Sequence, residues 1–300
     1  MPDRFKGTGV AIVTPFHREG NIDFKSFERL VEYQIESGID FIVFLGTTGE
    51  AVTLNYDEKN ALINFAVETV AGRVPIIIGI GGNNTQDIIG TIRKTSFEGI
   101  DAIMSVSPYY NKPQPKGIFY HYKNIAAASP VPVIIYNVPG RTASNIPAET
   151  TLKIAYEVPN IIGVKEASKD LSQCATIIRD KPEDFLMLSG DDCTAIPMLA
   201  LGGDGVISVI ANAYPADFSK LVNHCFNNEY ESARKVYFRL HSLIEGIFAD
   251  GSPSGIKAVL DIKGLCKNNL RLPLVKVNKG LYNQLSQMIE KYEETTVLAK

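Results

Sequence analysis

Eight short apolar runs, rich in β-branched residues, alternate with helical patterns, and this alternation limits the folds that the chain can adopt. Successive parallel strands need a crossover of helix length, so the pattern predicts a parallel sheet covered by helices. Eight such units are the number that closes an α/β (β/α)8 TIM barrel. A doubly wound open sheet is disfavoured, because no G-x-G-x-x-G turn follows the first run. The runs are residues 10–14, 41–45, 76–80, 102–106, 133–136, 161–165, 185–189 and 205–209.

The segments between the runs each carry one apolar face, as amphipathic helices do. In residues 23–38 this face consists of Phe24, Phe27, Leu30, Val31 and Ile35. In residues 56–72 it consists of Leu62, Phe65, Ala66 and Val70. Gly38 and Gly72 follow as expected left-handed C-terminal caps. After residue 211 the strand runs stop, so we predict a catalytic barrel over residues 1–226 and a helical C-terminal domain over 227–300.

Charge and composition argue against two classes of partner. The formal net charge is -3 and no Lys/Arg-rich run could follow a phosphate backbone, so no nucleic-acid partner is expected. The N-terminal residues lack the basic and apolar regions of a secretory signal, and no stretch reaches the ~18 consecutive apolar residues of a membrane span. We therefore expect a cytoplasmic protein without a membrane partner.

The cysteines and histidines have no spacing typical of a metal site. The four cysteines contain no Cys-x-x-Cys pair, and the four histidines are scattered along the chain. We expect free, buried thiols and no bound metal. The cysteines are Cys174, Cys193, Cys225 and Cys266.

Polar motifs follow several predicted strands, at the end of the barrel where enzymes of this fold carry their active sites. They are GTTGE at 46–50, SPYYNKP at 107–113, YNVPGRT at 136–142, KEAS at 165–168 and SGDD at 189–192. Together they would bring hydroxyls, a lysine, an arginine and a glycine-rich turn to one mouth. Taken singly, GTTG is also explained as a tight turn or an anion nest, and Arg141 as a solvated loop charge.

Lys165 ends the sixth apolar run, where a charged ammonium group would be leaving a hydrophobic core. A lysine there is either one half of an ion pair, with Glu166 or Asp191, or a desolvated amine nucleophile. The second role needs the neutral amine, and lowering its pKa from ~10.4 to ~7.5 corresponds to about 4 kcal/mol of differential solvation. The residues alone leave both roles open.

The motifs GTTGE, SPYYNKP, YNVPGRT and GVKEAS, in this order and spacing, resemble those of the dihydrodipicolinate synthase and N-acetylneuraminate lyase family of Schiff-base aldolases. The match extends from AIVTPF near the N-terminus through GVISVIAN to the helical tail. Thr48 and Arg141 resemble the dihydrodipicolinate synthase branch, because sialate lyases typically carry a serine and lack the arginine.

This resemblance implies a class I (Schiff-base) aldol condensation of pyruvate with L-aspartate 4-semialdehyde to give 4-hydroxy-tetrahydrodipicolinate, in lysine and diaminopimelate biosynthesis. It implies no metal or organic cofactor. Two alternatives stay open: a related pyruvate-dependent lyase acting on a sugar acid, and a catalytically silent relative that serves as a binding or scaffold protein. The presence of Lys165, Tyr136, Thr47 and Tyr110 argues against the silent relative.

Matched motif by motif, the resemblance implies catalytic roles for four residues. Lys165 forms the imine with pyruvate, and Tyr136 carries protons as acid and base in turn. Thr47 and Tyr110 complete the proton relay, with Tyr110 donated by a neighbouring subunit. A homo-oligomer is therefore implied, commonly a tetramer built as a dimer of dimers.

The resemblance also implies substrate contacts. Thr47 and Thr48 hold the pyruvate carboxylate, and Arg141 holds the carboxylate of the semialdehyde, a pairing suited to the guanidinium fork. Gly190 and Ile207 match backbone positions that line the pocket.

In family members that lysine inhibits, the effector lysine binds in a cleft at the tight dimer interface. The resemblance also matches the positions of that cleft to residues of this chain. Its positions here are Ala51, Val52, Tyr56, Lys59, Asn83, Asp87 and Tyr109. Lys59 stands where sensitive members commonly have a histidine, and two like charges about 4 Å apart at an effective dielectric near 20 repel by about 4 kcal/mol. We therefore expect weak or absent inhibition by lysine. A second departure is Ser252 before Pro253, where the family usually carries Asn-Pro.

Overall fold

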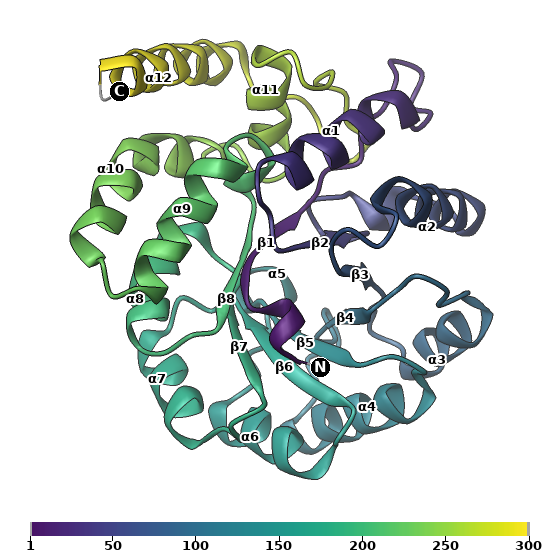
Figure 1. Cartoon of the computed structure of the whole chain (residues 1–300). Helices are drawn as coiled ribbons and strands as arrows, with labels where there is room; N and C mark the ends of the chain where they lie inside the picture. Colours follow the sequence, from purple (N-terminus) through teal and green to yellow (C-terminus); the bar gives the residue numbers. More distant parts are fainter. Residues whose placement is uncertain (1, 299–300) are drawn as a thin grey trace. The chain divides into compact units, whose positions relative to one another are not determined.

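The predicted strands form a closed parallel barrel in the computed structural model, which describes residues 2–298 of the chain (Figure 1). The strands follow one another around the barrel in sequence order. They are β1 (Gly7–Ala11), β2 (Phe41–Phe44), β3 (Ile76–Gly79), β4 (Ala102–Val106), β5 (Val133–Asn137), β6 (Ile161–Glu166), β7 (Leu186–Ser189) and β8 (Gly205–Ser208). The predicted TIM barrel with C-terminal helices is confirmed.

Helices connect the strands and continue after β8 (Figure 1). Those between strands are α1 (Phe24–Glu36), α2 (Tyr56–Val70), α3 (Thr85–Lys94), α4 (Pro115–Ala128), α5 (Pro139–Thr142), α6 (Ala148–Glu157), α7 (Leu171–Asp180) and α8 (Ala195–Ala200). Those after β8 are α9 (Pro215–Phe226), α10 (Tyr230–Gly246), α11 (Ser254–Ile262) and α12 (Lys279–Leu298). Short 3-10 turns are η1 (Pro2–Phe5), η2 (Ala51–Thr53), η3 (Asp192–Thr194) and η4 (Ile210–Asn212).

The first strand begins at Gly7, whereas the apolar run predicted a start at residue 10. Gly9 packs so closely on β2 that a Cβ atom there would lie 2.2 Å from the Phe41 ring. Beyond the strand, the Val13 N–H donates to the side chain of Asn212 at 3.0 Å. Glycine is a poor strand former, so its local preference did not predict a strand here. The close packing against Phe41 nevertheless requires a residue without a side chain at this position of the strand.

The buried face of α1 differs from the predicted face at one end. Phe27, Leu30 and Val31 are buried as predicted. Ile35 is only half-buried, and Gln34 is buried instead. The Gln34 amide donates to the backbone carbonyl of Asn212 at 3.0 Å, and this hydrogen bond permits a polar side chain in the core.

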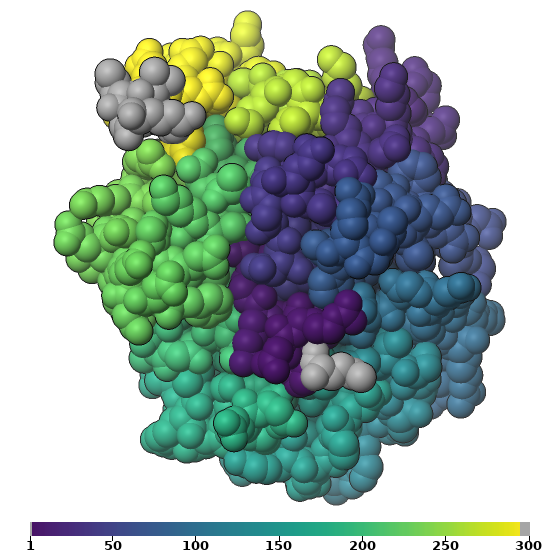
Figure 2. All heavy atoms as spheres, viewed as in Figure 1, coloured from purple at the N-terminus to yellow at the C-terminus, as the bar shows by residue number. Residues whose placement is uncertain are grey.

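The chain divides into two compact units that interleave along the sequence. The first contains Met1–Gly9, Asp40–Val43 and Val74–Ile207, and the second contains Val10–Ile39, Phe44–Arg73 and Ser208–Lys300. In the first unit, N-terminal residues (purple in Figure 2) lie beside teal residues of the same unit. The division into a barrel ending at residue 226 and a helical domain stays a prediction.

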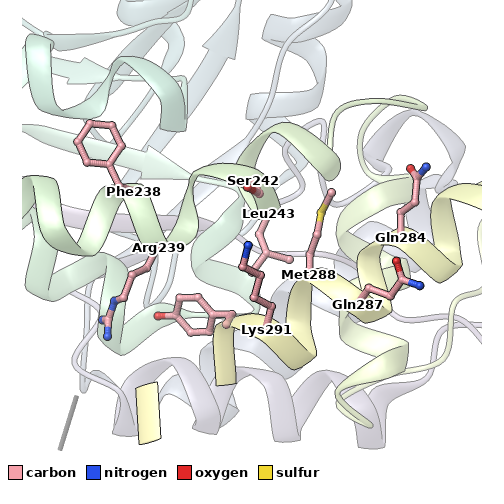
Figure 3. Close-up of a pocket in the computed structure, with 9 residues that line it drawn as sticks. Phe238, Arg239, Ser242, Leu243, Gln284, Gln287, Met288 and Lys291 are labelled. Carbon is pink, nitrogen blue, oxygen red and sulfur yellow. The ribbon is translucent and has the colours of Figure 1, made fainter. Parts of the chain in front are cut away.

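A cavity of about 730 Å³ lies between α10 and α12 in the second unit (Figure 3). It is lined by Phe238, Arg239, Ser242, Leu243, Gln284, Gln287, Met288, Lys291 and Tyr292. None of the residues predicted for the active site lines this cavity.

The thiols largely follow the prediction. Cys174, Cys225 and Cys266 are free and buried, whereas Cys193 is partly exposed. Among residues 2–298, no group of three His, Cys, Asp or Glu side chains is arranged to hold a metal ion. Within the same range, no helix is both long and apolar enough to cross a membrane.

Candidate active site

Lys165 and Tyr136 occupy paired positions near the ends of β6 and β5. Side chains at paired positions of neighbouring strands point to the same face of a sheet. The Lys165 Nζ accordingly lies 4.4 Å from the centroid of the Tyr136 ring, and both residues are buried. The strand register thus sets the amine over the ring of a tyrosine.

The Lys165 amine is removed from water. The residue is 4% exposed, and burial lowers its pKa from the usual 10.5 to about 8. The carboxylate of Asp192 opposes this shift, and the charge of Arg141 adds to it. At pH 7 a pKa of about 8 leaves roughly a tenth of the amine neutral, against roughly three parts in ten thousand at the usual value.

The two acids considered as ion-pair partners of Lys165 are held by other residues. Asp191 pairs with Lys169 at 3.0 Å. The Glu166 carboxylate accepts hydrogen bonds from three groups: Asn137 Nδ2, Ser168 N and Gln173 Nε2. Among the described residues neither of these two acids forms an ion pair with Lys165, and the acid whose charge acts on its amine is Asp192.

Gly190, directly after β7, leaves room for the Lys165 side chain. A Cβ atom at Gly190 would lie 3.0 Å from Lys165 Cε and 2.8 Å from Ala167 Cβ, closer than carbon atoms normally approach. The Gly190 N–H donates to the Glu166 carbonyl at 2.8 Å, which holds the backbone in this position. Ile207 is buried within β8. A side chain at residue 190 would therefore displace the amine.

Arg141 lies in α5, a single helical turn that follows β5 almost directly. Its N–H donates to the Val138 carbonyl at 2.9 Å, and the Thr142 hydroxyl donates to the Ser144 carbonyl at 2.7 Å. The Arg141 side chain is exposed, yet its charge lowers the pKa of Lys165. An exposed cation within electrostatic reach of a buried amine is suited to receive an incoming carboxylate.

Tyr110 projects from the loop after β4. Its backbone is left-handed, with φ 72°, and the residue is 89% exposed. The loop is held by Asn83, whose side chain donates to the Tyr109 carbonyl at 3.2 Å, and by Asn111, whose side chain donates to the Asn83 carbonyl at 3.0 Å. Within the described chain Tyr110 is therefore displayed outward and is not packed against Lys165.

The GTTGE loop belongs to the second unit, and the backbone is left-handed at its last residue and at the residue before it. Leu45 has φ 56° and Glu50 has φ 53°, a region that residues with side chains rarely adopt. Between them, Thr47 is exposed and Thr48 is buried. The loop is therefore more constrained than an ordinary tight turn.

Two buried features beside these motifs are additional to the predicted site. Asp192, the first residue of η3, is 1% exposed and its charge acts on Lys165. Glu50 and Lys257 form an ion pair whose side chains have no exposed surface. Lys257 stands in the apolar segment GIKAVL, the same kind of signal that singled out Lys165.

The predicted effector residues are divided between the two units. Those of the second unit are Ala51 in η2 and Tyr56 and Lys59 in α2. Those of the first unit are Asn83, Asp87 and Tyr109. Lys59 is half-buried, and burial lowers its pKa. Asp87 is exposed at the start of α3 and accepts a hydrogen bond from the Asn84 side chain at 2.8 Å.

Comparison with known proteins matches residues 4–292 to a model of the dihydrodipicolinate synthetase family. A 4-hydroxy-tetrahydrodipicolinate synthase of Flavobacterium psychrophilum is 47% identical over 281 residues, which are 94% of this chain and 96% of that protein. The structure of the chloride-inhibited dihydrodipicolinate synthase of Acinetobacter baumannii complexed with pyruvate has a TM-score of 0.92 and 37% identity, covering 96% of this chain and 99% of that one. The enzyme of Cyanidioschyzon merolae with lysine bound has a TM-score of 0.93 and 37% identity, covering 97% and 99%.

These relatives are synthases, which favours the synthase over the sugar-acid lyase and the scaffold protein. Similarity also extends over nearly the whole length of each protein, so the barrel and its C-terminal helices are matched together. The chain therefore belongs to the dihydrodipicolinate synthetase family and has 4-hydroxy-tetrahydrodipicolinate synthase activity, that of a lyase of lysine and diaminopimelate biosynthesis.

Proposed function

We propose that Lys165 carries out this reaction as a Schiff-base nucleophile toward pyruvate. The observation that carries the proposal is a buried amine with a pKa of about 8 against the ring of Tyr136. A neutral amine attacks the ketone carbon of pyruvate, and the loss of one water leaves an imine. The related enzyme of Acinetobacter baumannii forms a complex with pyruvate, which supports pyruvate as the first substrate.

The imine nitrogen withdraws electrons, so the pyruvate methyl group can lose a proton and become an enamine. The enamine carbon then attacks the aldehyde carbon of L-aspartate 4-semialdehyde, and the aldehyde oxygen takes up a proton. Attack of the semialdehyde amine on the imine carbon closes the ring and releases the amine of Lys165. One water is lost overall, and no oxidant or reductant is needed.

We assign the proton transfers to Tyr136, because its ring lies against the reacting amine. A phenol has a pKa near ~10 and needs partners that pass the proton on, for which Thr47 and Tyr110 are the candidates. Thr47 lies in the GTTGE loop that follows β2. The exposure of Tyr110 supports its donation to the active site of a neighbouring subunit. Such donation needs at least a dimer, and we propose a tetramer built from two such dimers.

The two substrate carboxylates have separate proposed partners. Thr47 and Thr48 hold the carboxylate of pyruvate, and Arg141 holds the carboxylate of the semialdehyde through its planar fork. Gly190 and Ile207 line the pocket through their backbone groups. We further propose that the enzyme works in the cytoplasm without a metal or organic cofactor.

Borohydride reduction in the presence of pyruvate, followed by peptide mapping, tests the central step. We expect a covalent mark on Lys165 that is lost in Lys165→Ala. A mark on another lysine would overturn the assignment. Assays of the reduced and unreduced enzyme with semialdehyde and with sugar-acid aldehydes then identify the second substrate.

Arg141→Ala tests the proposed role of the arginine. At saturating pyruvate, the final extent to which Lys165 is trapped should stay close to that of the wild type. The kcat/KM for semialdehyde should fall by about 10- to 100-fold, as expected for the loss of one hydrogen bond to a charged group. Equal losses in both steps would show instead that Arg141 is structural.

A further inference from the structure

The GTTGE loop is held in a backbone conformation that its residues do not favour by themselves. The positive φ angles of Leu45 and Glu50 persist only where the surroundings enforce them. The Glu50 N–H donates to the Thr47 carbonyl at 3.1 Å, so these two residues belong to one hydrogen-bonded turn. A displacement of Glu50 therefore also displaces Thr47.

The carboxylate of Glu50 is buried and uses both of its oxygens. Lys257 Nζ donates to Oε1, and the backbone N–H of Arg271 donates to Oε2 at 3.0 Å. Lys257 comes from α11, and Arg271 follows that helix. Both donors to the loop carboxylate are thus supplied by the C-terminal part of the second unit.

Further contacts hold the Lys257 side chain in this position. Its Nζ also donates to the Asn269 carbonyl at 2.8 Å and lies 4.3 Å from the centroid of the Phe16 ring. Burial lowers the pKa of Lys257, and the charge of Glu50 opposes that shift. Removing two charges from water is expensive, so a buried ion pair is weak evidence for a purely stabilising role.

Arg271 holds the residues that follow the loop. Its guanidinium donates to the Thr53 carbonyl at 2.9 Å and pairs with Glu58. The N–H and the hydroxyl of Thr53 both donate to the Glu50 carbonyl, each at 2.9 Å. The same C-terminal segment therefore contacts the loop directly at Glu50 and again through Thr53.

The loop also contacts the segment that follows β1. The Thr14 hydroxyl donates to the Gly49 carbonyl at 2.7 Å. A Cβ atom at Gly49 would lie 3.1 Å from the Ile12 carbonyl oxygen, so the two segments are in close contact. The loop is therefore held both by the segment after β1 and by Lys257 of α11.

We propose that Glu50 and Lys257 are positioning residues for pyruvate binding, through which the C-terminal region sets the place of Thr47 and Thr48. The inference rests on the proposed function, which assigns the pyruvate carboxylate to these threonines. Because a misplacement of about 1 Å can reduce a rate about 100-fold, loss of the anchor affects pyruvate use beyond any loss of stability.

Lys257→Met is the first test variant, since methionine fills similar space without the amine. Its matched control is Lys181→Met. Lys181 is 10% exposed at its side chain and pairs with Asp204 at 3.2 Å. This pair precedes β7 and β8, at the end of the barrel opposite to the loops that follow the strands. Each variant removes the cation of a largely buried ion pair, and only Lys257→Met affects the GTTGE loop.

The measurement is the pyruvate concentration that gives half-maximal borohydride trapping of Lys165, together with the KM for semialdehyde and the Tm. For Lys257→Met we expect the pyruvate value to rise about tenfold or more, and the KM for semialdehyde to change by less than about twofold. For Lys181→Met we expect a lower Tm with both values within about twofold of the wild type. Equal pyruvate values in the two variants would overturn the inference.

The double variant Glu50→Gln/Lys257→Met covers the case in which Lys257→Met does not fold. It removes both charges, so no uncompensated charge is left in the interior. We expect it to fold and to keep the raised pyruvate requirement, because the loop has still lost its anchor. A double variant with the wild-type requirement would overturn this inference alone. A wild type that pyruvate does not trap would overturn the proposed function and this inference with it.

Discussion

The side-chain amide of Asn137 donates to both carboxylate oxygens of Glu166, at 2.9 and 3.0 Å. These residues form the next register pair after Tyr136 and Lys165. Because side chains alternate along a strand, they point to the opposite face of the sheet. A buried hydrogen-bonded pair therefore joins β5 and β6 directly behind the amine and the phenol, and it holds the two strands in register.

Glu166→Gln should lower the free energy of unfolding by about 1–3 kcal/mol, because the new NH2 group would face buried donors that now bond to a carboxylate oxygen. Denaturant unfolding measures this loss. Glu157→Gln, at an exposed position of α6, serves as the control and should change stability by less than about 0.5 kcal/mol. A loss in Glu166→Gln no larger than in the control would contradict the structural role of the pair.

The rate of imine formation should depend on pH through Lys165. The protonated amine is not a nucleophile, so the trapping rate at low pyruvate should fall about tenfold for each pH unit below the pKa. Since burial lowers that pKa to about 8, the rate should level off above about pH 8. Initial trapping rates between pH 6 and about 10 check this. A rate still rising steeply at the top of the range would indicate an amine that is not desolvated.

Two charged neighbours of Lys165 should shift the rising limb of the trapping rate, which is the pH range where the rate increases, in opposite directions. Asp192 raises the pKa of Lys165 and Arg141 lowers it. The limb should therefore shift to lower pH in Asp192→Asn and to higher pH in Arg141→Gln. Lys169→Gln is the control, because Lys169 pairs with Asp191 and should leave the limb in place. Shifts of the same sign in both variants would refute the electrostatic assignment.

Subunit mixing should test the donation of Tyr110. Tyr110→Phe and Lys165→Ala should each have low activity alone. In a mixed dimer, one site would combine Lys165 of one subunit with Tyr110 of the other, so activity should return toward about a quarter of the wild-type value, the binomial share of restored sites. Activity is measured after co-refolding or co-expression of the two variants. No recovery in verified mixed dimers would place Tyr110 in its own subunit's site or outside it.

Inhibition by lysine should be weak or absent. Lys59 would place a cation in the predicted effector cleft, and even about a third of the expected repulsion weakens binding about tenfold. Burial lowers the pKa of Lys59, which reduces the repulsion without turning this side chain into an attractive partner. Inhibition titrations should give Lys59→His greater sensitivity, with the exposed Lys25→His unchanged. Micromolar inhibition of the wild type would refute the charge argument.

The barrel was predictable because apolar runs coincide with buried strands, as at residues 102–106 and β4. Local sequence preferences gave a wrong prediction where one specific contact allows a residue that is unfavourable in a strand or in the core. Gly9 lies in β1 because the Phe41 ring occupies the space of a side chain. Gln34 replaces Ile35 in the core because its amide has a hydrogen-bond partner. Neither contact leaves a periodic signal in the sequence.

In the candidate site, too, local patterns were predictable from the sequence and single contacts were not. Lys165 was recognisable because a lysine at the end of an apolar run is unusual. The adjacent acids Asp191 and Asp192 look alike in sequence, and only the η3 turn directs the first to Lys169 and buries the second. The contact of Lys257 with Glu50 joins residues 207 positions apart, a separation that no local pattern reveals.

The position of Lys257 also limits how far this enzyme can be shortened by design. Among the described residues, the Glu50 carboxylate receives its hydrogen bonds from residues 257 and 271. A protein truncated after residue 226 would lose both of these donors, so its GTTGE loop would no longer be held through Glu50. A minimal barrel made from this sequence would therefore need a new contact for this loop before its last helices could be removed.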